Sequence, residues 1–277
     1  MLDFTQDPNL GSIRLIACDM DNTLLADDKS QPEGMAELID ELRAADVIFC
    51  PASGRPAPTL QMMFPEHRHD MAFCADNGAS IVYRGDYVYK DLIDPAVYHE
   101  LVRATIEEGS GIPVLCAFDE AYVLASGHPY HDALSVYYKV INYVDSFDDI
   151  DVESNKYTIY FPNRNSQQAS EEVFGPAFGD KLCVAGAGVE WLDFMNKGVN
   201  KGSGLHHLCE QLGVDIADTA AIGDTYNDIE MLEAAGHSFV VANAEEHMRA
   251  HAQYLLPSNN DRGVATLIRA ILAAKGR

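Results

Sequence analysis

The feature of this sequence that most constrains its fold is a short apolar run followed directly by a polar cluster, repeated along the chain. Such runs occupy residues 13–18, 47–51, 71–75 and 219–222, and helical patterns separate most of them. Strands that alternate with helices favour βαβ units, whose strands form a parallel sheet. Ligands bind at the carboxyl ends of strands in such sheets. The polar clusters are therefore predicted to meet at one edge of a parallel sheet.

The helical patterns carry their own start and stop signals. Ser30, Pro32 and Glu33 predict a helix start, as an N-cap, a first-turn proline and a capping-box acid. Apolar side chains then recur at helical spacing, at Met35, Leu38, Ile39 and Leu42. Further helices are predicted over residues 201–212, 227–235 and 263–274.

The pattern changes between about Tyr83 and Met195. Arg84-Gly85-Asp86 is typical of a hairpin turn, so part of a second sheet is expected to be antiparallel. Aromatic and β-branched runs predict strands at 113–118, 121–125, 155–161, 181–186 and 189–194. Helical stretches lie near 95–108, 129–141 and 167–175. After Met195 the first pattern returns, with strands at 219–222 and 238–241. The chain is therefore predicted to be an α/β protein in which a second α/β domain interrupts a parallel-sheet core.

The charge of the chain excludes some classes of partner. Its 277 residues include 19 Lys+Arg and 43 Asp+Glu, which gives a formal net charge of -24. So acidic a surface repels a phosphate backbone and an anionic membrane, and neither nucleic acid nor membrane is expected as a partner. No apolar run approaches the roughly 18 residues that span a bilayer. The first ten residues lack the basic and apolar regions of a signal peptide, so a cytoplasmic location is expected.

The cysteines and histidines do not form metal-ligand motifs. Six cysteines are present, without a CxxC pair, at Cys18, Cys50, Cys74, Cys116, Cys183 and Cys209. All but Cys209 lie in apolar runs, so they are expected to be small buried side chains in a reducing compartment. The sequence has no HExxH pattern and no paired Cys/His spacing, so zinc is not predicted. It also has no GxxxxGK[ST] loop, so nucleotide use is not indicated.

Two acidic clusters follow apolar runs. Asp19 and Asp21 lie two residues apart and point to the same side of an extended segment. The second cluster occupies residues 223–228, Gly-Asp-Thr-Tyr-Asn-Asp. Neighbouring carboxylates need a neutralising partner, and a hard divalent cation with oxygen ligands is the natural one. A simpler alternative exists for Asp228, because Thr225-x-x-Asp228 fits a capping box.

Two further features indicate phosphate binding. Lys201 opens a predicted helix, where a lysine is unfavourable for the helix dipole and so calls for another reason, such as phosphate binding. Ser53, Gly54 and Arg55 supply a hydroxyl and backbone amides near a helix start, where anions bind readily. Each feature alone is weak, since exposed lysines and polar loops are common.

Together these motifs resemble those of the haloacid dehalogenase superfamily, over nearly the whole chain. Residues 19–24 match its Asp-x-Asp-x-Thr-Leu motif, and residues 53–55 match its Ser/Thr motif with the usual Gly-Arg. Residues 201–202 match its Lys-Gly motif, and residues 223–228 match Gly-Asp-x-x-Asn-Asp. Asn77-Gly78-Ala79, the long insertion and the tail Asn259-x-x-x-Gly263-Val264-Ala265 resemble the Cof-type subfamily. The chain has Ser53 where that subfamily usually has Thr, and Thr225 where it often has Ser; both substitutions keep the hydroxyl.

The resemblance implies a Rossmann-like parallel-sheet core with an inserted α/β cap domain. The core is expected to comprise residues 1–83 and 195–277, and the cap residues 84–194. The implied activity is a Mg²⁺-dependent phosphohydrolase of small phosphorylated metabolites, mostly sugar phosphates. Residues of the cap are expected to contact the leaving group, although the sequence does not identify them. The sequence does not indicate the oligomeric state either.

The resemblance also implies roles for individual residues. Asp19 is expected to attack phosphorus and become an aspartyl phosphate, while Asp21 acts as general acid and then general base. Mg²⁺ is expected to bind the Asp19 carboxylate, the Asp21 backbone carbonyl and Asp224, with Asp228 supporting it from behind. The expected substrate-binding residues are Ser53, Gly54, Arg55, Lys201 and Asn227, with Ser53 and Lys201 holding the phosphoryl oxygens during catalysis.

Two other functions remain open at this stage. A phosphomutase or other phosphotransferase uses the same aspartyl phosphate but returns the phosphoryl group to a substrate, and a time course of phosphate release separates the two. A phosphorylated regulatory domain of the bacterial receiver type combines similar residues. Such domains are much shorter, lack an inserted domain and carry the acceptor after a later strand, so the hydrolase is favoured.

Overall fold

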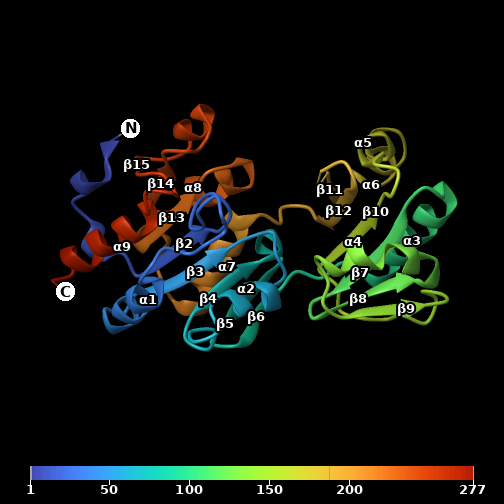
Figure 1. The fold of residues 1–277 in the computed structure, drawn as a ribbon, viewed down its shortest axis with the longest axis horizontal. Helices are drawn as coiled ribbons and strands as arrows, with labels where there is room; N and C mark the ends of the chain where they lie inside the picture. The colour runs from blue at the N-terminus through green and yellow to red at the C-terminus, as the bar shows by residue number, and fades with distance from the viewer. Residues whose placement is uncertain (1, 187, 277) are drawn as a thin grey trace. The chain divides into compact units, whose positions relative to one another are not determined.

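The computed structural model describes residues 2–186 and 188–276, and the chain forms two compact units (Figure 1). One unit, here called the core, comprises Met1–Tyr89 and Asn200–Arg277; the other, here called the cap, comprises Lys90–Val199. From the sequence, these crossings were predicted earlier, at 83/84 and 194/195. The first crossing falls later because strand β6 (Asp86–Lys90) belongs to the core sheet. The second falls later because strand β12 (Trp191–Asn196) belongs to the cap sheet.

The core is built on a nine-stranded sheet with the order β1-β15-β14-β13-β2-β3-β4-β5-β6. Neighbouring strands from β1 to β4 pair in parallel, which confirms the predicted parallel sheet, and β4 and β5 pair antiparallel. The predicted hairpin turn joins β5 to β6. The strands other than β6 are β1 (Leu2–Asp3), β2 (Leu15–Asp19), β3 (Ile48–Ala52), β4 (Ala72–Ala75), β5 (Ser80–Tyr83), β13 (Thr219–Gly223), β14 (His237–Val241) and β15 (Tyr254–Leu256). The short strands β1, at the edge of the sheet, and β15, next to it, were not predicted.

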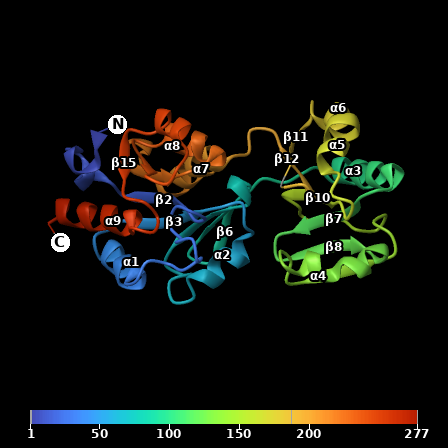
Figure 2. The ribbon, with the colours of Figure 1, turned by 45° about the horizontal axis from the view of Figure 1, so that its top comes forward.

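Helices cover both faces of the core sheet (Figure 2). They are α1 (Met35–Ala44), α2 (Ala57–Met63), α7 (Lys201–Leu212), α8 (Ile229–Ala234) and α9 (Gly263–Ala274). Ile16 and Cys18 of β2 pack in one apolar cluster with side chains of α1, α2 and α9, whereas Leu15 and Ala17 pack in a second with α7 and α8. Burial on both faces explains why this strand is a nearly continuous apolar run. Among the described residues, no helix has the length and apolar character needed to cross a membrane.

The first helix begins later than predicted. Ser30 does not cap it, because its backbone N–H and hydroxyl both donate to the carboxylate of Asp28, at 2.9 and 2.6 Å. The chain then turns through Gly34, whose φ of 79° lies in the left-handed region, and α1 starts at Met35. The predicted apolar face is confirmed, since the four periodic side chains are buried.

The cap contains a six-stranded sheet with the order β11-β12-β10-β7-β8-β9. All neighbours are antiparallel except β8 and β9, so the expected mixture with antiparallel pairing is confirmed. Its strands other than β12 are β7 (Ile112–Ala117), β8 (Glu120–Leu124), β9 (Ile141–Val144), β10 (Lys156–Tyr160) and β11 (Leu182–Gly186). Its helices are α3 (Pro95–Glu108), α4 (His131–Ser135), α5 (Ser166–Ala169) and α6 (Gly175–Phe178).

One predicted helix of the cap is largely wrong. The stretch 129–141 forms only the end of a 3₁₀ helix (Ala125–Tyr130) and the short α4, and Ile141 already begins β9. The residues of β9, Ile-Asn-Tyr-Val, include two β-branched side chains and an aromatic one, which suit a strand, and they pair along β8.

Candidate active site

The predicted site residues of the core meet where its parallel strands end. Asp19 is the last residue of β2 and pairs in register with Ala52, the last residue of β3. Ser53 follows directly after β3, and Asp224 follows directly after Gly223, the last residue of β13. Because β2 lies between β13 and β3, the three polar groups converge at one edge of the sheet.

Three of the predicted carboxylates form a compact buried cluster around a lysine. One oxygen from each of Asp19, Asp224 and Asp228 lies within 4.8 Å of the others. Lys201, the first residue of α7, is completely buried, and its Nζ donates to Asp19 at 2.5 Å and to Asp228 at 2.7 Å. We call these four residues the carboxylate–lysine cluster.

Asp228 supports the cluster from behind. Its Oδ1 accepts from Lys201, and its Oδ2 accepts from the backbone N–H groups of Asp224 and Thr225, at 3.0 and 3.1 Å. The capping box between Thr225 and Asp228 is formed. The Asp228 carboxylate therefore caps the helix start and also supports the carboxylate–lysine cluster, so these two roles are not alternatives. Both of its oxygens are engaged by the protein, which agrees with an indirect role toward a metal.

Two residues whose roles the sequence analysis did not assign complete the cluster. Thr23 is buried, and its hydroxyl donates to Oδ1 of Asp224 at 2.7 Å. Gly202 allows α7 to lie close to α8, because a Cβ at this position would lie 2.5 Å from the carbonyl oxygen of Glu230. The signal for both was present in the matched motifs, since Thr23 belongs to the first and Gly202 follows the lysine of the third.

The electrostatics of the cluster fit a divalent cation. Burial raises the pKa of Asp19 to about 7, even though Lys201 opposes the shift. Burial also raises the pKa of Asp224. Burial would lower the pKa of Lys201, but Asp19 and Asp228 outweigh it and raise that pKa. One ammonium cannot balance three carboxylates, and the donors are all hard oxygens, so the residues present fit Mg²⁺.

The side chain of Asp21 does not join the cluster. Its carboxylate accepts from the Arg55 guanidinium at 2.8 and 2.9 Å and from Lys29 at 3.0 Å, and 38% of the side chain is exposed. Partial burial would raise the pKa of Asp21, but the hydrogen bonds from Arg55 and Lys29 outweigh burial and lower it. Arg55, which was predicted to contact substrate, holds the predicted general acid in this structure, and Lys29 is a contact that was not predicted.

The remaining predicted residues border the same edge of the sheet. Ser53 is buried, and its hydroxyl accepts from the backbone N–H of Arg55 at 3.3 Å. The backbone N–H of Asn77 donates to the Ser53 carbonyl at 3.0 Å, and the Asn77 side chain accepts from Asn227 at 3.0 Å. Gly54 leaves room for this asparagine, because a Cβ there would lie 3.1 Å from Asn77 Nδ2. Asn77 therefore connects the second motif, through Ser53, with the fourth motif, through Asn227.

A sharp turn brings Asn77 to the start of α7. Asp76 and Asn77 both have left-handed φ angles, 51° and 54°, and Gly78 follows with a φ of 96°. A Cβ at Gly78 would lie 2.2 Å from the carbonyl oxygen of Asn200, so only glycine fits. Asn200 in turn caps α7, accepting from the N–H of Ser203 at 2.8 Å. The turn therefore fixes the helix end that carries Lys201.

Residues 16–268 match the family of haloacid dehalogenase-like hydrolases. The chain belongs to this family. The match spans both segments of the core and the whole insertion, and it confirms the resemblance that the four motifs carried.

Individual relatives of the haloacid dehalogenase family agree. The 5-amino-6-(5-phospho-D-ribitylamino)uracil phosphatase of Escherichia coli is 33% identical over 271 residues, which cover 94% of this chain and 97% of that protein. A solved structure from Eubacterium rectale superposes with a TM-score of 0.87, at 27% identity, over 94% of this chain and 99% of that chain. The subclass IIB sugar phosphatase BT4131 shares the fold, with a TM-score of 0.73 at 20% identity, over 92% of this chain and 98% of that chain. The protein is a phosphoric monoester hydrolase of the haloacid dehalogenase type, with the Cof-type core and cap.

Proposed function

We propose that the protein is a Mg²⁺-dependent phosphatase of small sugar or sugar-alcohol phosphates, working through a phosphorylated Asp19. The observation that carries the proposal is the buried carboxylate–lysine cluster at the strand ends. It presents one carboxylate, Asp19, with a cationic side chain directly beside it and with excess negative charge that a divalent cation would offset.

In the first half-reaction, an oxygen of Asp19 attacks phosphorus, and the ester oxygen leaves as Asp21 gives it a proton. In the second, Asp21 takes a proton from water, which attacks phosphorus and releases inorganic phosphate and the Asp19 carboxylate. Lys201, which contacts Asp19 directly, would stabilise the charge of the phosphoryl oxygens in both steps. Ser53 contributes its hydroxyl and Asn227 its amide at the border of the site.

The carboxylates of Asp19 and Asp224 and the backbone carbonyl of Asp21 would hold Mg²⁺. When bound, the ion supplies the positive charge that a loose phosphoryl transition state requires. Thr23 orients Asp224 for this task, and Asp228 fixes the loop that carries Asp224.

Asp21 has to leave its present contacts before it can act as an acid. Bonded to Arg55 and Lys29, it is held in the ionised form, which suits the base of the second half-reaction. We propose that a substrate phosphoryl group draws Arg55 away from Asp21 and takes its guanidinium as a partner. Arg55 would then bind phosphate, as the sequence predicted, and its departure would let the pKa of Asp21 rise toward the value that proton donation needs.

The substrate class is inferred from the relatives. The name of the E. coli protein describes a phosphate on a ribityl chain, and the subclass IIB protein BT4131 is named a sugar phosphatase. A phosphomonoester on a polyhydroxylated carbon chain is common to both. We therefore propose substrates of that chemistry.

The experiment is a screen for phosphate release from sugar phosphates, sugar-alcohol phosphates, nucleotides and an aryl phosphate, with Mg²⁺ and with EDTA. Purified Asp19→Asn, checked by mass for deamidation, serves as the control that lacks the nucleophile. Release that requires Mg²⁺ and is absent from Asp19→Asn supports the proposal. Undiminished turnover in EDTA or in Asp19→Asn would refute the mechanism. Phosphoryl transfer between sugars without phosphate release would instead indicate a mutase.

A further inference from the structure

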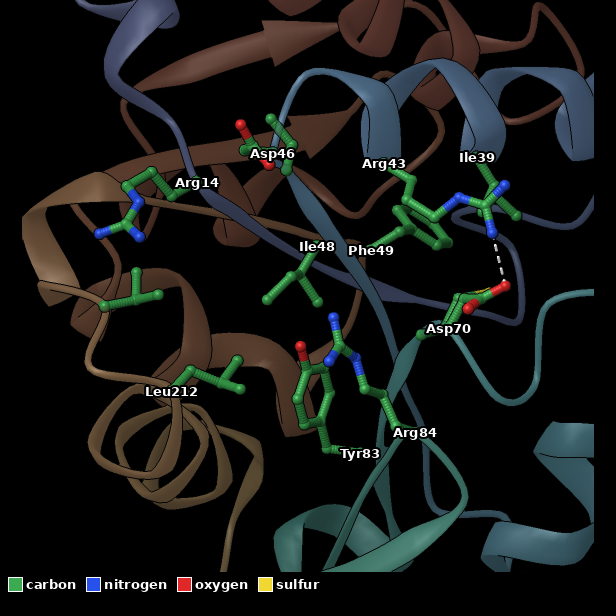
Figure 3. A pocket seen from close by; sticks show the side chains of 13 residues that line it. Arg14, Ile39, Arg43, Asp46, Ile48, Phe49, Asp70, Tyr83, Arg84 and Leu212 are labelled. Carbon is green, nitrogen blue, oxygen red and sulfur yellow. Dashed lines mark hydrogen bonds and ion pairs between the residues drawn. The ribbon is translucent and has the colours of Figure 1, made fainter.

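A pocket lies in the core, at the end of the central strands opposite to the carboxylate–lysine cluster (Figure 3). Arg14, which lines it, immediately precedes β2, and Ile48 begins β3, whereas Asp19 and Ala52 end these two strands. The cavity has a volume of about 280 Å³. This is just below the range of roughly 300–1,000 Å³ that is typical of small-molecule sites. The pocket is therefore separate from the active site and suits a small ligand.

Arginine side chains contribute positive charge to this pocket, whereas the protein as a whole is acidic. Arg14, Arg43 and Arg84 all line it, in a chain with a formal net charge of -24. Arg43 is neutralised, because it donates to Asp70 at 2.6 Å and to Asp40 at 2.9 Å.

The other two arginines have no such partner. Across the described residues, neither Arg14 nor Arg84 forms an ion pair. Asp46 also lines the pocket and offsets one positive charge. Two guanidiniums with free donors beside one pocket are unusual in a protein with more than twice as many acidic as basic residues.

The backbone and a neighbouring ring hold Arg84 in place. It occupies the hairpin turn between β5 and β6 with a φ of 54°, followed by Gly85 at 92°. Asparagine or glycine is the usual residue at such a position, so an arginine there strains the backbone. Its guanidinium lies 5.1 Å from the centre of the Tyr83 ring. Stacking of this kind reduces the freedom that a flexible arginine would lose on binding a ligand.

Apart from Asp70, which is paired with Arg43, the rest of the lining is apolar. Figure 3 shows Ile48 between Arg14 and Arg84, with Tyr83 beside Arg84 and Leu212 on a separate segment. A ligand in this pocket would meet guanidinium donors together with aliphatic and aromatic surface.

We propose that this pocket binds a small phosphate-bearing metabolite, with Arg14 and Arg84 donating to its phosphate oxygens and its apolar part against Ile48, Tyr83 and Leu212. Guanidinium forks match phosphate oxygens in geometry and in charge. The site contains none of the residues assigned to Mg²⁺ or to phosphoryl transfer, so binding there requires no metal and leaves the ligand intact.

The test uses phenylphosphonate, a dianion with an aromatic ring that a phosphatase cannot hydrolyse. Its binding is measured by calorimetry in EDTA for the wild type, for the double variant Arg14→Gln/Arg84→Gln and for the control Arg269→Gln. Arg269 is an exposed arginine of α9 that is not part of the pocket lining. We expect binding in the wild type and the control, at least tenfold weaker binding in the double variant, and weaker binding of methylphosphonate to the wild type.

Two further measurements keep the test decisive. Arg55→Gln, which removes a cation from the active site, should retain phenylphosphonate binding, which separates this pocket from the active site and from any failure of the proposed function. The Nε–Hε resonances of Arg14 and Arg84 in the wild type should shift on titration, whereas that of Arg269 should not, and this readout does not depend on the folding of a variant. Equal affinity in all three proteins, or unmoved Arg14 and Arg84 resonances, would overturn the proposal.

Discussion

Thr23 donates a 2.7 Å hydrogen bond to Oδ1 of Asp224, a residue 201 positions away in the sequence. The bond joins the loop after β2 to the loop after β13, and both partners are buried. A carboxylate whose orientation is fixed in this way is prepared for a metal ion before the ion arrives.

Removing that hydroxyl should weaken metal binding. Thr23→Val keeps the shape of the side chain but leaves Asp224 without its donor, so we expect Mg²⁺ affinity to fall by about 10-fold to 100-fold, as for other partners of metal ligands. Calorimetric titration with Mg²⁺ measures the change, and Thr23→Ser, which keeps the hydroxyl, is the matched control. Equal affinity in Thr23→Val and the wild type would show that the bond is only structural.

Lys201 should matter for both rate and stability. We expect Lys201→Met to lower the rate of phosphate release by roughly 10²–10³-fold, by analogy with the loss of one oxyanion donor. Because Lys201 is fully buried between two carboxylates, the variant should also lose about 3–5 kcal/mol of unfolding free energy in EDTA. Kinetics and denaturant titration measure the two effects, with Lys275→Met as the control. A variant of normal activity and normal stability would leave Lys201 without a role.

Proton and metal should compete at Asp19. Its pKa of about 7 in the metal-free protein means that Mg²⁺ must displace a proton below that pH. We expect Mg²⁺ affinity to rise with pH up to about 7, by up to about tenfold per pH unit, and to level off above it. Titrations at pH 6, 7 and 8 measure this, and a flat profile would contradict the assignment.

The same pKa has a consequence for stability. The folded state holds a proton on Asp19 that the unfolded state, with an ordinary value near 3.8, has lost. Between these two values the folded state binds more protons, so this group makes stability in EDTA fall as pH rises from about 4 to 7. The fall should be smaller in Asp19→Asn, and saturating Mg²⁺ should remove it from the wild type. Thermal melts across this pH range provide the comparison.

Lys29 should tune the acid step through Asp21. Lys29→Gln removes one of the groups that lower the pKa of Asp21, so the alkaline limb of the kcat/KM profile should move to higher pH. The shift should appear with a sugar phosphate, whose leaving group needs a proton. It should be absent with 4-nitrophenyl phosphate, whose leaving group does not. Identical shifts with both substrates would mean that Lys29 acts on some other group.

The sequence was most informative where local pattern and tertiary structure agree. Helix α7 has the predicted bounds, because an asparagine cap precedes Lys201 and Gly213, in the left-handed conformation, follows Leu212. The start of α1 was misplaced because Asp28 competes for Ser30, a contact that the capping pattern does not encode.

The details of the site depended on long-range placement. Asp19 and Asp224 were predicted to share a site because each follows a strand, but their link through Thr23 depends on β13 lying next to β2. The contact of Asp21 with Arg55 and Lys29 was not foreseen, because Lys29 lies in an irregular loop whose path no periodicity describes. Asn77 was expected at a strand end and as a subfamily marker, but its left-handed turn and its bond with Asn227 became visible only in three dimensions.

Asn200 is the first residue of the core after the inserted unit. It is also the residue that caps the N-terminus of helix α7. Only Asn200 separates the inserted unit from Lys201. Gly78 packs so closely against the Asn200 carbonyl that the backbone at this junction cannot shift. Changes of length should therefore be tolerated very unequally on its two sides. An extra residue before Val199 lengthens a connection, whereas one after Asn200 turns α7 by about 100° and removes Lys201 from its carboxylates. A cap can be exchanged for another during evolution, but the exchange has to end before this asparagine.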